Sequence, residues 1–159
     1  MSDYRMTIGP IVAARSLREA YKPRASNAVA ALGLRYERKV KAELLRLLAN
    51  NDLVRVEHNP WFTFSDTYGT NNCCPDFILW RENGLIVVEV KLTWVPIALA
   101  KLHDLYLPVV AQALDMPVLP LVICRNTTPM APRASFSVRD ALASEGKLLQ
   151  WPTMGRIQW

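Results

Sequence analysis

Three ionisable residues have the types and the spacing of a site that binds a metal ion and a phosphate: Asp76, Glu89 and Lys91. Asp76 opens one predicted strand. Glu89 and Lys91 are two residues apart on the next strand, so their side chains share one face, whereas Val90 between them points into the core. Charges on strands that are otherwise apolar are costly to bury. A bound divalent cation and a phosphate would account for all three charges together.

These residue types suit Mg²⁺, which prefers hard oxygen ligands and keeps several waters. Asp76 and Glu89 would supply carboxylates, and the main-chain carbonyl of Val90 would supply a third oxygen. Such a cation polarises a phosphate and activates a bound water. Lys91 would position or deprotonate that water, or stabilise the added negative charge. The expected chemistry is hydrolysis of a phosphate ester.

The segment PDFILWRENGLIVVEVK, residues 75–91, resembles the PD-(D/E)XK nuclease superfamily. The resemblance implies a restriction-endonuclease-like fold, with a mixed central sheet flanked by helices, and hydrolysis of phosphodiester bonds with Mg²⁺ or Mn²⁺. It also implies an acid on the helix before the first core strand, where Glu37 and Glu43 are both candidates. At about 100° per residue, Glu37 falls within the apolar arc and Glu43 at its margin. We therefore expect Glu37 to be the catalytic acid.

A narrower resemblance, to the bacteriophage endonuclease I-like Holliday-junction resolvases, covers roughly residues 35–92. It rests on Glu37, the aromatic run 61–64, the triplet 75–77 and the acid-x-Lys strand, and the C-terminal half adds no matching motif. It implies branched DNA as a substrate. Some nucleases of the superfamily also carry a glutamine on the helix after the lysine strand. Gln112 is our candidate for this catalytic role, and an ordinary helix-surface residue is the alternative.

The elements around these residues predict an α/β fold. Apolar periodicity predicts helices over residues 26–50, from Pro96 to about Met116 and over 137–145, and strands over 53–58, 61–65, 75–81, 85–92 and 118–124. Ser26 or Asn27 would cap the first helix, and Ser137 the last. Asn83-Gly84 predicts a hairpin, Pro108 a kink or break, and residues 85–124 a βαβ unit. Residues 67–72 are expected to be a loop, and 1–24 an arm with a short helix over 11–21.

Charge is unevenly distributed over what we expect to be a single nuclease domain, residues 1–159, with residues 1–24 as its N-terminal arm. The net charge is +5. Residues 1–50 carry ten Lys or Arg and four Asp or Glu (+6), residues 51–124 four and eight (−4), and residues 125–159 five and two (+3). Basic ends around an acidic middle favour nucleic acid as the partner. We expect one basic helix face to contact phosphates, although it could serve solubility alone: Arg35, Arg38, Lys39 and Arg46.

The remaining features predict a cytoplasmic protein, in the host cytoplasm if it is phage-encoded. The three cysteines form no disulfide or zinc pattern, and neither a signal peptide nor a membrane span is evident. A homodimer is expected because one such site cuts one strand, and because the aromatic tail, residues 151–159, has no element to complete. The alternative is a monomer whose tail folds back on its own sheet.

Three functions compete. The first is an endonuclease that cuts duplex or branched DNA with Mg²⁺ or Mn²⁺. The second is a catalytically inert nucleic-acid-binding module of the same fold, which the intact Asp76, Glu89 and Lys91 disfavour. The third is a structural protein in which the strand charges form a buried ion pair. Of the other polar residues, His58 and His103 are expected to be surface or capping side chains.

Overall fold

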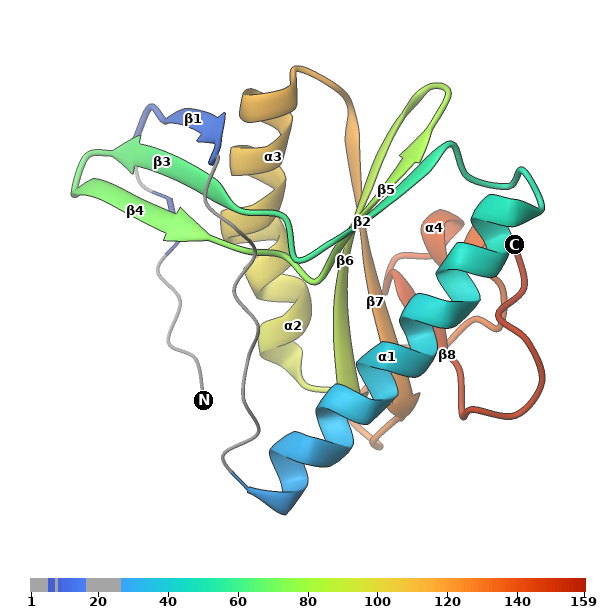
Figure 1. Ribbon diagram of the computed structural model, residues 1–159. Helices are drawn as coiled ribbons and strands as arrows, with labels where there is room; N and C mark the ends of the chain where they lie inside the picture. Colours follow the sequence, from blue (N-terminus) through green and yellow to red (C-terminus); the bar gives the residue numbers. More distant parts are fainter. Residues whose placement is uncertain (1–5, 8, 17–26) are drawn as a thin grey trace.

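The chain forms two β-sheets with helices packed around them (Figure 1), as seen in a computed structural model that describes residues 6, 7, 9–16 and 27–159. The smaller sheet has the order β1-β3-β4, with β1 at Val12–Arg15, β3 at Phe62–Asp66 and β4 at Gly69–Cys73. The larger sheet has the order β2-β5-β6-β7-β8, with β2 at Arg55–His58, β5 at Phe77–Arg81, β6 at Gly84–Thr93, β7 at Val118–Asn126 and β8 at Leu148–Gln150. The helices are α1 (Ala28–Ala49), α2 (Pro96–Lys101), the π-helical turn η1 (Leu102–Tyr106), α3 (Leu107–Leu114) and α4 (Val138–Ala143). The predicted α/β class is confirmed.

The larger sheet is mixed. β2, β5 and β6 are antiparallel neighbours, whereas β6, β7 and β8 run parallel. The predicted hairpin forms with Arg81 paired to Gly84. A Cβ on Gly84 would lie 2.8 Å from the carbonyl oxygen of Pro117, so glycine is needed where this turn meets the start of β7. The predicted βαβ unit is the crossover from β6 to β7.

Both faces of the larger sheet are covered, which is why β6 is a nearly continuous apolar run. Ile86 and Val88 point into one core, which α1, α4 and the C-terminal tail cover. Leu85 and Val87 point into a second core, beneath α2, η1 and α3. Phe62 and Phe64 of β3 close that second core, and the small sheet lies against α3 (Figure 1).

Two helix starts follow the predicted chemistry. The side chain of Asn27 caps α1 by accepting a hydrogen bond from the N–H of Ala30 at 2.8 Å. Ser137 caps α4 in the same way, accepting from the N–H of Asp140 at 3.1 Å. Each cap satisfies one of the N–H groups that a helix leaves without a partner at its first turn.

Pro108 does not end the helix that contains it. The ring has no N–H to donate to the carbonyl of Asp104, and the backbone adapts by forming η1, in which the N–H of Leu107 donates to the carbonyl of Leu102. The carbonyl of Asp104 accepts instead from the N–H of Thr7 at 3.1 Å. The expected kink or break is thus a π-helical turn.

The continuous helical run Pro96–Leu114 is long and apolar enough to cross a membrane by length and composition alone. Its buried residues, among them Ala98, Leu102 and Val109, pack in the second core. In the most apolar window of this run, 33% is buried inside the protein.

Two local predictions were wrong. The helix expected over 11–21 is contradicted at Val12–Arg15, which is strand β1 paired with β3; residues 17–26 lie outside the described part. The loop expected over 67–72 is largely strand β4. β4 has four exposed residues before Cys73, so it lacks the apolar alternation that reveals a strand. It is held by cross-strand pairs instead, such as Thr63 with Asn72 at 2.9 Å.

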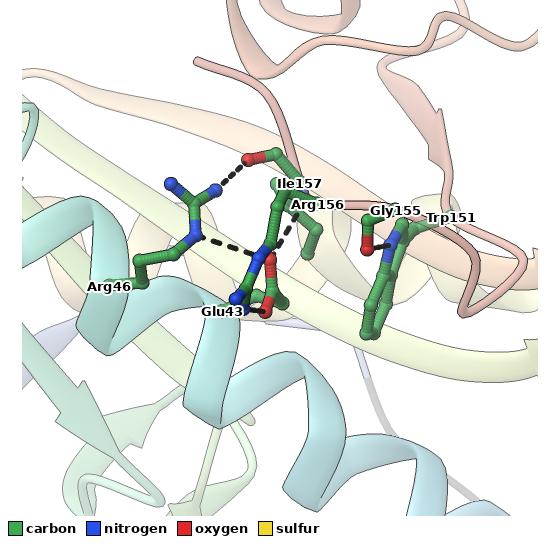
Figure 2. Close-up of polar contacts among 6 residues, drawn as sticks. All are labelled: Glu43, Arg46, Trp151, Gly155, Arg156 and Ile157. Carbon is green, nitrogen blue, oxygen red and sulfur yellow. Dashed lines mark hydrogen bonds and ion pairs between the residues drawn. The ribbon is translucent and has the colours of Figure 1, made fainter.

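The aromatic tail packs on its own chain. β8 joins the edge of the larger sheet, and Trp151 is buried beside Tyr36, whose hydroxyl donates to the Trp151 carbonyl at 2.9 Å. Figure 2 shows how Glu43 of α1 fixes the last turn of the tail, accepting from the N–H of Ile157 at 3.0 Å and from the guanidinium of Arg156 at 3.0 Å. The aromatic tail therefore no longer supports a dimer, because it packs within its own chain.

Candidate active site

Five residues predicted from the sequence line one cleft of about 310 Å³: Glu37, Asp76, Glu89, Val90 and Lys91. They come from three elements. Glu37 lies on α1, Asp76 immediately precedes β5, and the other three lie near the end of β6. The antiparallel pairing of β5 with β6 brings the two strand acids to the same end of the sheet.

Asp76 is held by the neighbouring strand. Its Oδ2 accepts a hydrogen bond of 2.7 Å from the N–H of Val90, and its carbonyl accepts one of 2.9 Å from the N–H of Asn59. Burial, followed by the charges of Glu89 and Glu37, raises the pKa of the Asp76 carboxyl well above its usual value, although the Val90 N–H opposes this shift. The main chain thus fixes a carboxylate in a place that disfavours its negative charge.

Glu89 is one of two buried charged residues in the described part of the chain, and 4% of it is exposed. Its Oε1 lies 3.4 Å from the Nζ of Lys91 and 4.0 Å from the Nζ of Lys101, whereas its Oε2 is buried with no hydrogen-bond partner. Burial raises the pKa of Glu89, and the two lysines only partly offset the shift. The unpartnered oxygen is costly unless a cation or a donor reaches it.

The two candidate helix acids have different surroundings. Glu37 lies at the cleft and its Oε2 is 3.0 Å from the Nε2 of His58, whereas Glu43 is committed to the C-terminal tail. The structure places Glu37 at the cleft, but the burial expected from the helix angles is reversed: Glu43 is buried with 6% exposed, whereas Glu37 is only partly buried. The His58 ring in turn stacks on Phe77 at 4.7 Å between ring centroids.

Sequence reasoning missed His58 and Lys101 as neighbours of the site. His58 was expected to be a surface or capping residue, but its pairing with Phe77 in the β2–β5 register brings it beside Glu37. That register could have been inferred from the two predicted strands. Lys101 comes from α2, and nothing in its spacing to Glu89 indicates contact, because the turn before α2 decides it.

Gln112 does not join this group. Its Oε1 accepts a hydrogen bond from the N–H of Ala13, which ties α3 to β1. It does not line the cleft that holds the acids. The structure therefore gives Gln112 a partner in the fold and no contact with the other candidate catalytic residues.

The predicted basic face of α1 is exposed at Arg35, Arg38 and Lys39, but Arg46 is engaged with Glu43 and with the carbonyl of Ile157. At about 100° per residue, Arg35 and Lys39 lie about 160° around the helix from Glu37, and Arg46 about 180°. Arg38 is only about 100° away. Most of this face thus points away from the side of α1 that carries the cleft acid.

The adjacent thiols are unsuited to nucleophilic work. Burial, with the nearby carboxylates of Asp76, Glu37 and Glu89, raises the pKa of Cys74 to about 12. Burial also raises the pKa of Cys73 to about 12. Both thiols therefore stay protonated at neutral pH, when the thiolate is the reactive form.

A divalent cation fits the residues at the cleft. Two carboxylates lie near one another, one buried oxygen of Glu89 has no partner, and both acids have raised pKa values. A positive ion would relieve each of these costs. No group of three or more His, Cys, Asp and Glu side chains arranged for a metal occurs in the described part. Asp76 and Glu89 would thus need main-chain and water oxygens as further ligands, which Mg²⁺ accepts.

Comparison of the chain with protein-family models, with curated proteins and with solved structures gave no match in any of the three.

Proposed function

We propose that this chain is a metal-dependent nuclease of the PD-(D/E)XK kind that hydrolyses phosphodiester bonds in DNA. The observation that carries the proposal is the convergence of Glu37, Asp76, Glu89 and Lys91 on one cleft. These residues were chosen from the sequence, Glu37 through the resemblance and its place on the helix, and they are as much as 54 positions apart between the first and the last (91 − 37).

The order of elements also supports the proposal. α1 precedes three antiparallel strands, β2, β5 and β6, and a helical crossover then leads to the parallel strand β7. A mixed sheet flanked by helices, with an acid on the helix before the first core strand, is what the resemblance to the superfamily implies. We therefore propose the restriction-endonuclease-like fold as the finer description.

Each residue of the cleft has a role that follows from its position. A Mg²⁺ or Mn²⁺ ion, when bound, would supply a Lewis acid that polarises the phosphate. Asp76 and Glu89 would hold that ion, with the Val90 carbonyl as a further oxygen. The side chain of Lys91 is 32% exposed at the cleft, so its ammonium can meet the developing negative charge of the phosphate. Glu37, fixed by His58, would orient the attacking water.

A purely structural ion pair is the main competitor, since Glu89 does contact two lysines. A structural ion pair explains why Glu89 is buried beside the lysines, but it does not explain the other acids near Glu89. Asp76 and Glu37 are two further acids beside it, and burial, followed by the charges of Glu89 and Glu37, raises the pKa of Asp76. Such a shift opposes stability at a pH above the unfolded pKa. A site that accumulates negative charge at such a cost is better explained by a cation that binds there.

The test is cleavage of a panel of nucleic acids with Mg²⁺ and with Mn²⁺. The panel contains duplex DNA, a four-way junction, single-stranded DNA and RNA. We expect cation-dependent cleavage of at least one DNA substrate, loss of cleavage in Lys91→Ala, and retention in Arg133→Ala, which removes an exposed charge elsewhere. Binding without cleavage would favour the inert nucleic-acid-binding module, and undiminished cleavage by Lys91→Ala would refute the assigned site.

A further inference from the structure

Lys101 is a second lysine at the acid cluster, and it approaches from a different element than Lys91. Its Nζ lies 4.0 Å from Oε1 of Glu89, the same oxygen that Lys91 contacts at 3.4 Å. The two lysines differ in exposure. The side chain of Lys101 is 15% exposed, and that of Lys91 is 32% exposed and lines the cleft.

The π-helical turn holds Lys101 in this place. Lys101 and Tyr106 are five residues apart, and η1 between them has the hydrogen bonding that joins residues five apart. The Nζ of Lys101 accordingly lies over the ring of Tyr106, 5.1 Å from its centroid. Stacking of an ammonium on an aromatic ring restrains a side chain that would otherwise be flexible.

Tyr106 is itself fixed to the segment between β4 and β5 that contains the other acid. Its hydroxyl donates a hydrogen bond of 3.1 Å to the carbonyl of Cys74, two residues before Asp76. The Lys101–Tyr106 pair therefore links the Glu89 side chain to the chain that leads into Asp76. Lys101 and Tyr106, which η1 connects, thus contact both segments that carry the acids: β6, and the residues between β4 and β5.

We infer that Lys101 is a positioning residue that holds Oε1 of Glu89 and thereby leaves Lys91 free to reach a phosphate in the cleft. One carboxylate oxygen does not need two ammonium partners. Lys91 is the nearer of the two lysines in this structure, but the more buried Lys101 is the one that Tyr106 restrains, and the exposed Lys91 can leave Glu89 for a substrate. Because Lys101 is a cation bound to a carboxylate that would also bind a divalent ion, it also competes with that ion for Glu89.

Only the expected effect on turnover rests on the proposed function. The competition between Lys101 and the metal ion for Glu89 can be measured with Mn²⁺ alone. The variant is Lys101→Met, which keeps an apolar stem. Calorimetric titration with Mn²⁺ should give about tenfold tighter binding, because a like charge is removed from beside Glu89. Turnover of DNA should fall about tenfold with little change in KM, because Lys91 is then left to hold Glu89 without the help of Lys101.

Controls separate this role from a structural one. Arg133→Met removes an exposed positive charge that does not line the cleft and should leave Mn²⁺ affinity unchanged. Lys101→Arg keeps the positive charge beside Glu89 and can still stack on Tyr106, so it should bind Mn²⁺ less tightly than Lys101→Met does. Tyr106→Phe loses the hydrogen bond to Cys74 but keeps the ring beneath Lys101, so it should keep the Mn²⁺ affinity of the wild type, whereas Tyr106→Leu should shift that affinity in the same direction as Lys101→Met.

Mn²⁺ affinity that is unchanged or weaker in a folded Lys101→Met protein would overturn the inference, because a site that is merely loosened binds less tightly. Unaltered turnover in that variant would overturn it too. If the wild type cuts no substrate, the proposed nuclease fails, whereas the Mn²⁺ titration still decides whether Lys101 acts on Glu89.

Discussion

The Oδ2 of Asp76 accepts a hydrogen bond of 2.7 Å from the N–H of Val90, so the acid before β5 is fixed to β6 at the residue between Glu89 and Lys91. The contact brings the Pro75-Asp76 pair and the strand residues Glu89 to Lys91 together in space. It uses a main-chain donor and therefore does not depend on the side chain at position 90. The Asp76 carboxyl also lies within hydrogen-bonding reach of the Glu37 side chain.

Replacement of Asp76 should have opposite effects on the two properties: cleavage activity should be lost, and the metal-free protein should become more stable in the asparagine variant. We expect Asp76→Asn and Asp76→Ala to abolish cleavage and to weaken Mn²⁺ binding. Without metal, Asp76→Asn should be about 1 kcal/mol more stable than the wild type at pH 7, because its amide oxygen can still accept from Val90 and carries no buried charge. The acid has a raised folded-state pKa. Its penalty is therefore absent at low pH and appears as the pH rises above the unfolded value of about 3.9.

Urea unfolding in EDTA, with and without added Mn²⁺, measures both effects. Full cleavage activity in either variant would show that Asp76 is not part of the active site. A metal-free Asp76→Asn protein less stable than the wild type would show that the carboxylate stabilises the fold.

Glu43 should contribute to stability and not to catalysis. Burial alone would raise its pKa, but the N–H of Ile157 and the guanidinium groups of Arg156 and Arg46 lower it overall. We expect Glu43→Ala to cost about 2 kcal/mol, because the buried N–H of Ile157 loses its acceptor. Glu43→Gln, which keeps a carbonyl oxygen, should cost less.

The pH dependence of this contribution has a definite sign. Because the folded-state pKa of Glu43 is lowered, its contribution is complete above the unfolded value of about 4.3 and is lost as the pH falls below it. Thermal unfolding of wild type and Glu43→Gln between pH 7 and pH 3 should therefore show a stability difference that narrows in acid. A difference that widens in acid would contradict this role.

The sequence predicted the part of the site that depends on strands and on one long helix. Alternation and the Asn83-Gly84 turn determine the β5–β6 pairing, and that pairing places Asp76 beside Glu89. Lys101 could not be found this way, because its position depends on a π-helical turn that adapts to Pro108 and on a tertiary contact with Tyr106. β4 was missed because its exposed residues carry no apolar period, and β8 because a strand of three residues is too short to show one.

Substrate binding should depend on Arg38 more than on the rest of the predicted basic face. Arg38 lies nearest in angle to Glu37, whereas Lys39 points to the opposite side of α1. For duplex DNA, Arg38→Gln should lower the slope of log affinity against log salt by roughly 0.9, the value for one lost phosphate contact. Lys39→Gln should leave the slope unchanged. Equal effects of the two substitutions would indicate that the whole basic face of α1 binds DNA.

A homodimer remains a prediction, now on chemical grounds alone. One site of this kind cuts one strand, so cutting both strands in one encounter calls for two copies related by symmetry. The aromatic residue Trp151 is buried within the chain and offers no interface. Sedimentation at micromolar concentration, with and without DNA, should show a dimer in at least one condition. A monomer in both would indicate a nicking enzyme.

His58 should act through Glu37. Its Nε2 lies 3.0 Å from Oε2 of Glu37, and the Phe77 ring beneath it limits its rotation. Removal of the ring in His58→Ala would free Glu37 to turn away from Asp76, and we expect cleavage to fall about tenfold, as is usual when a supporting contact is lost. His58→Gln keeps an N–H that can reach Glu37 and should recover much of that loss. Because Glu37 orients water and does not bind DNA in the proposed mechanism, the loss should appear in kcat with KM unchanged. In a Glu37→Gln background, His58→Ala should cause little further loss, since two residues that act as a unit are not additive. A full, additive loss in the double variant would show that His58 works independently of Glu37.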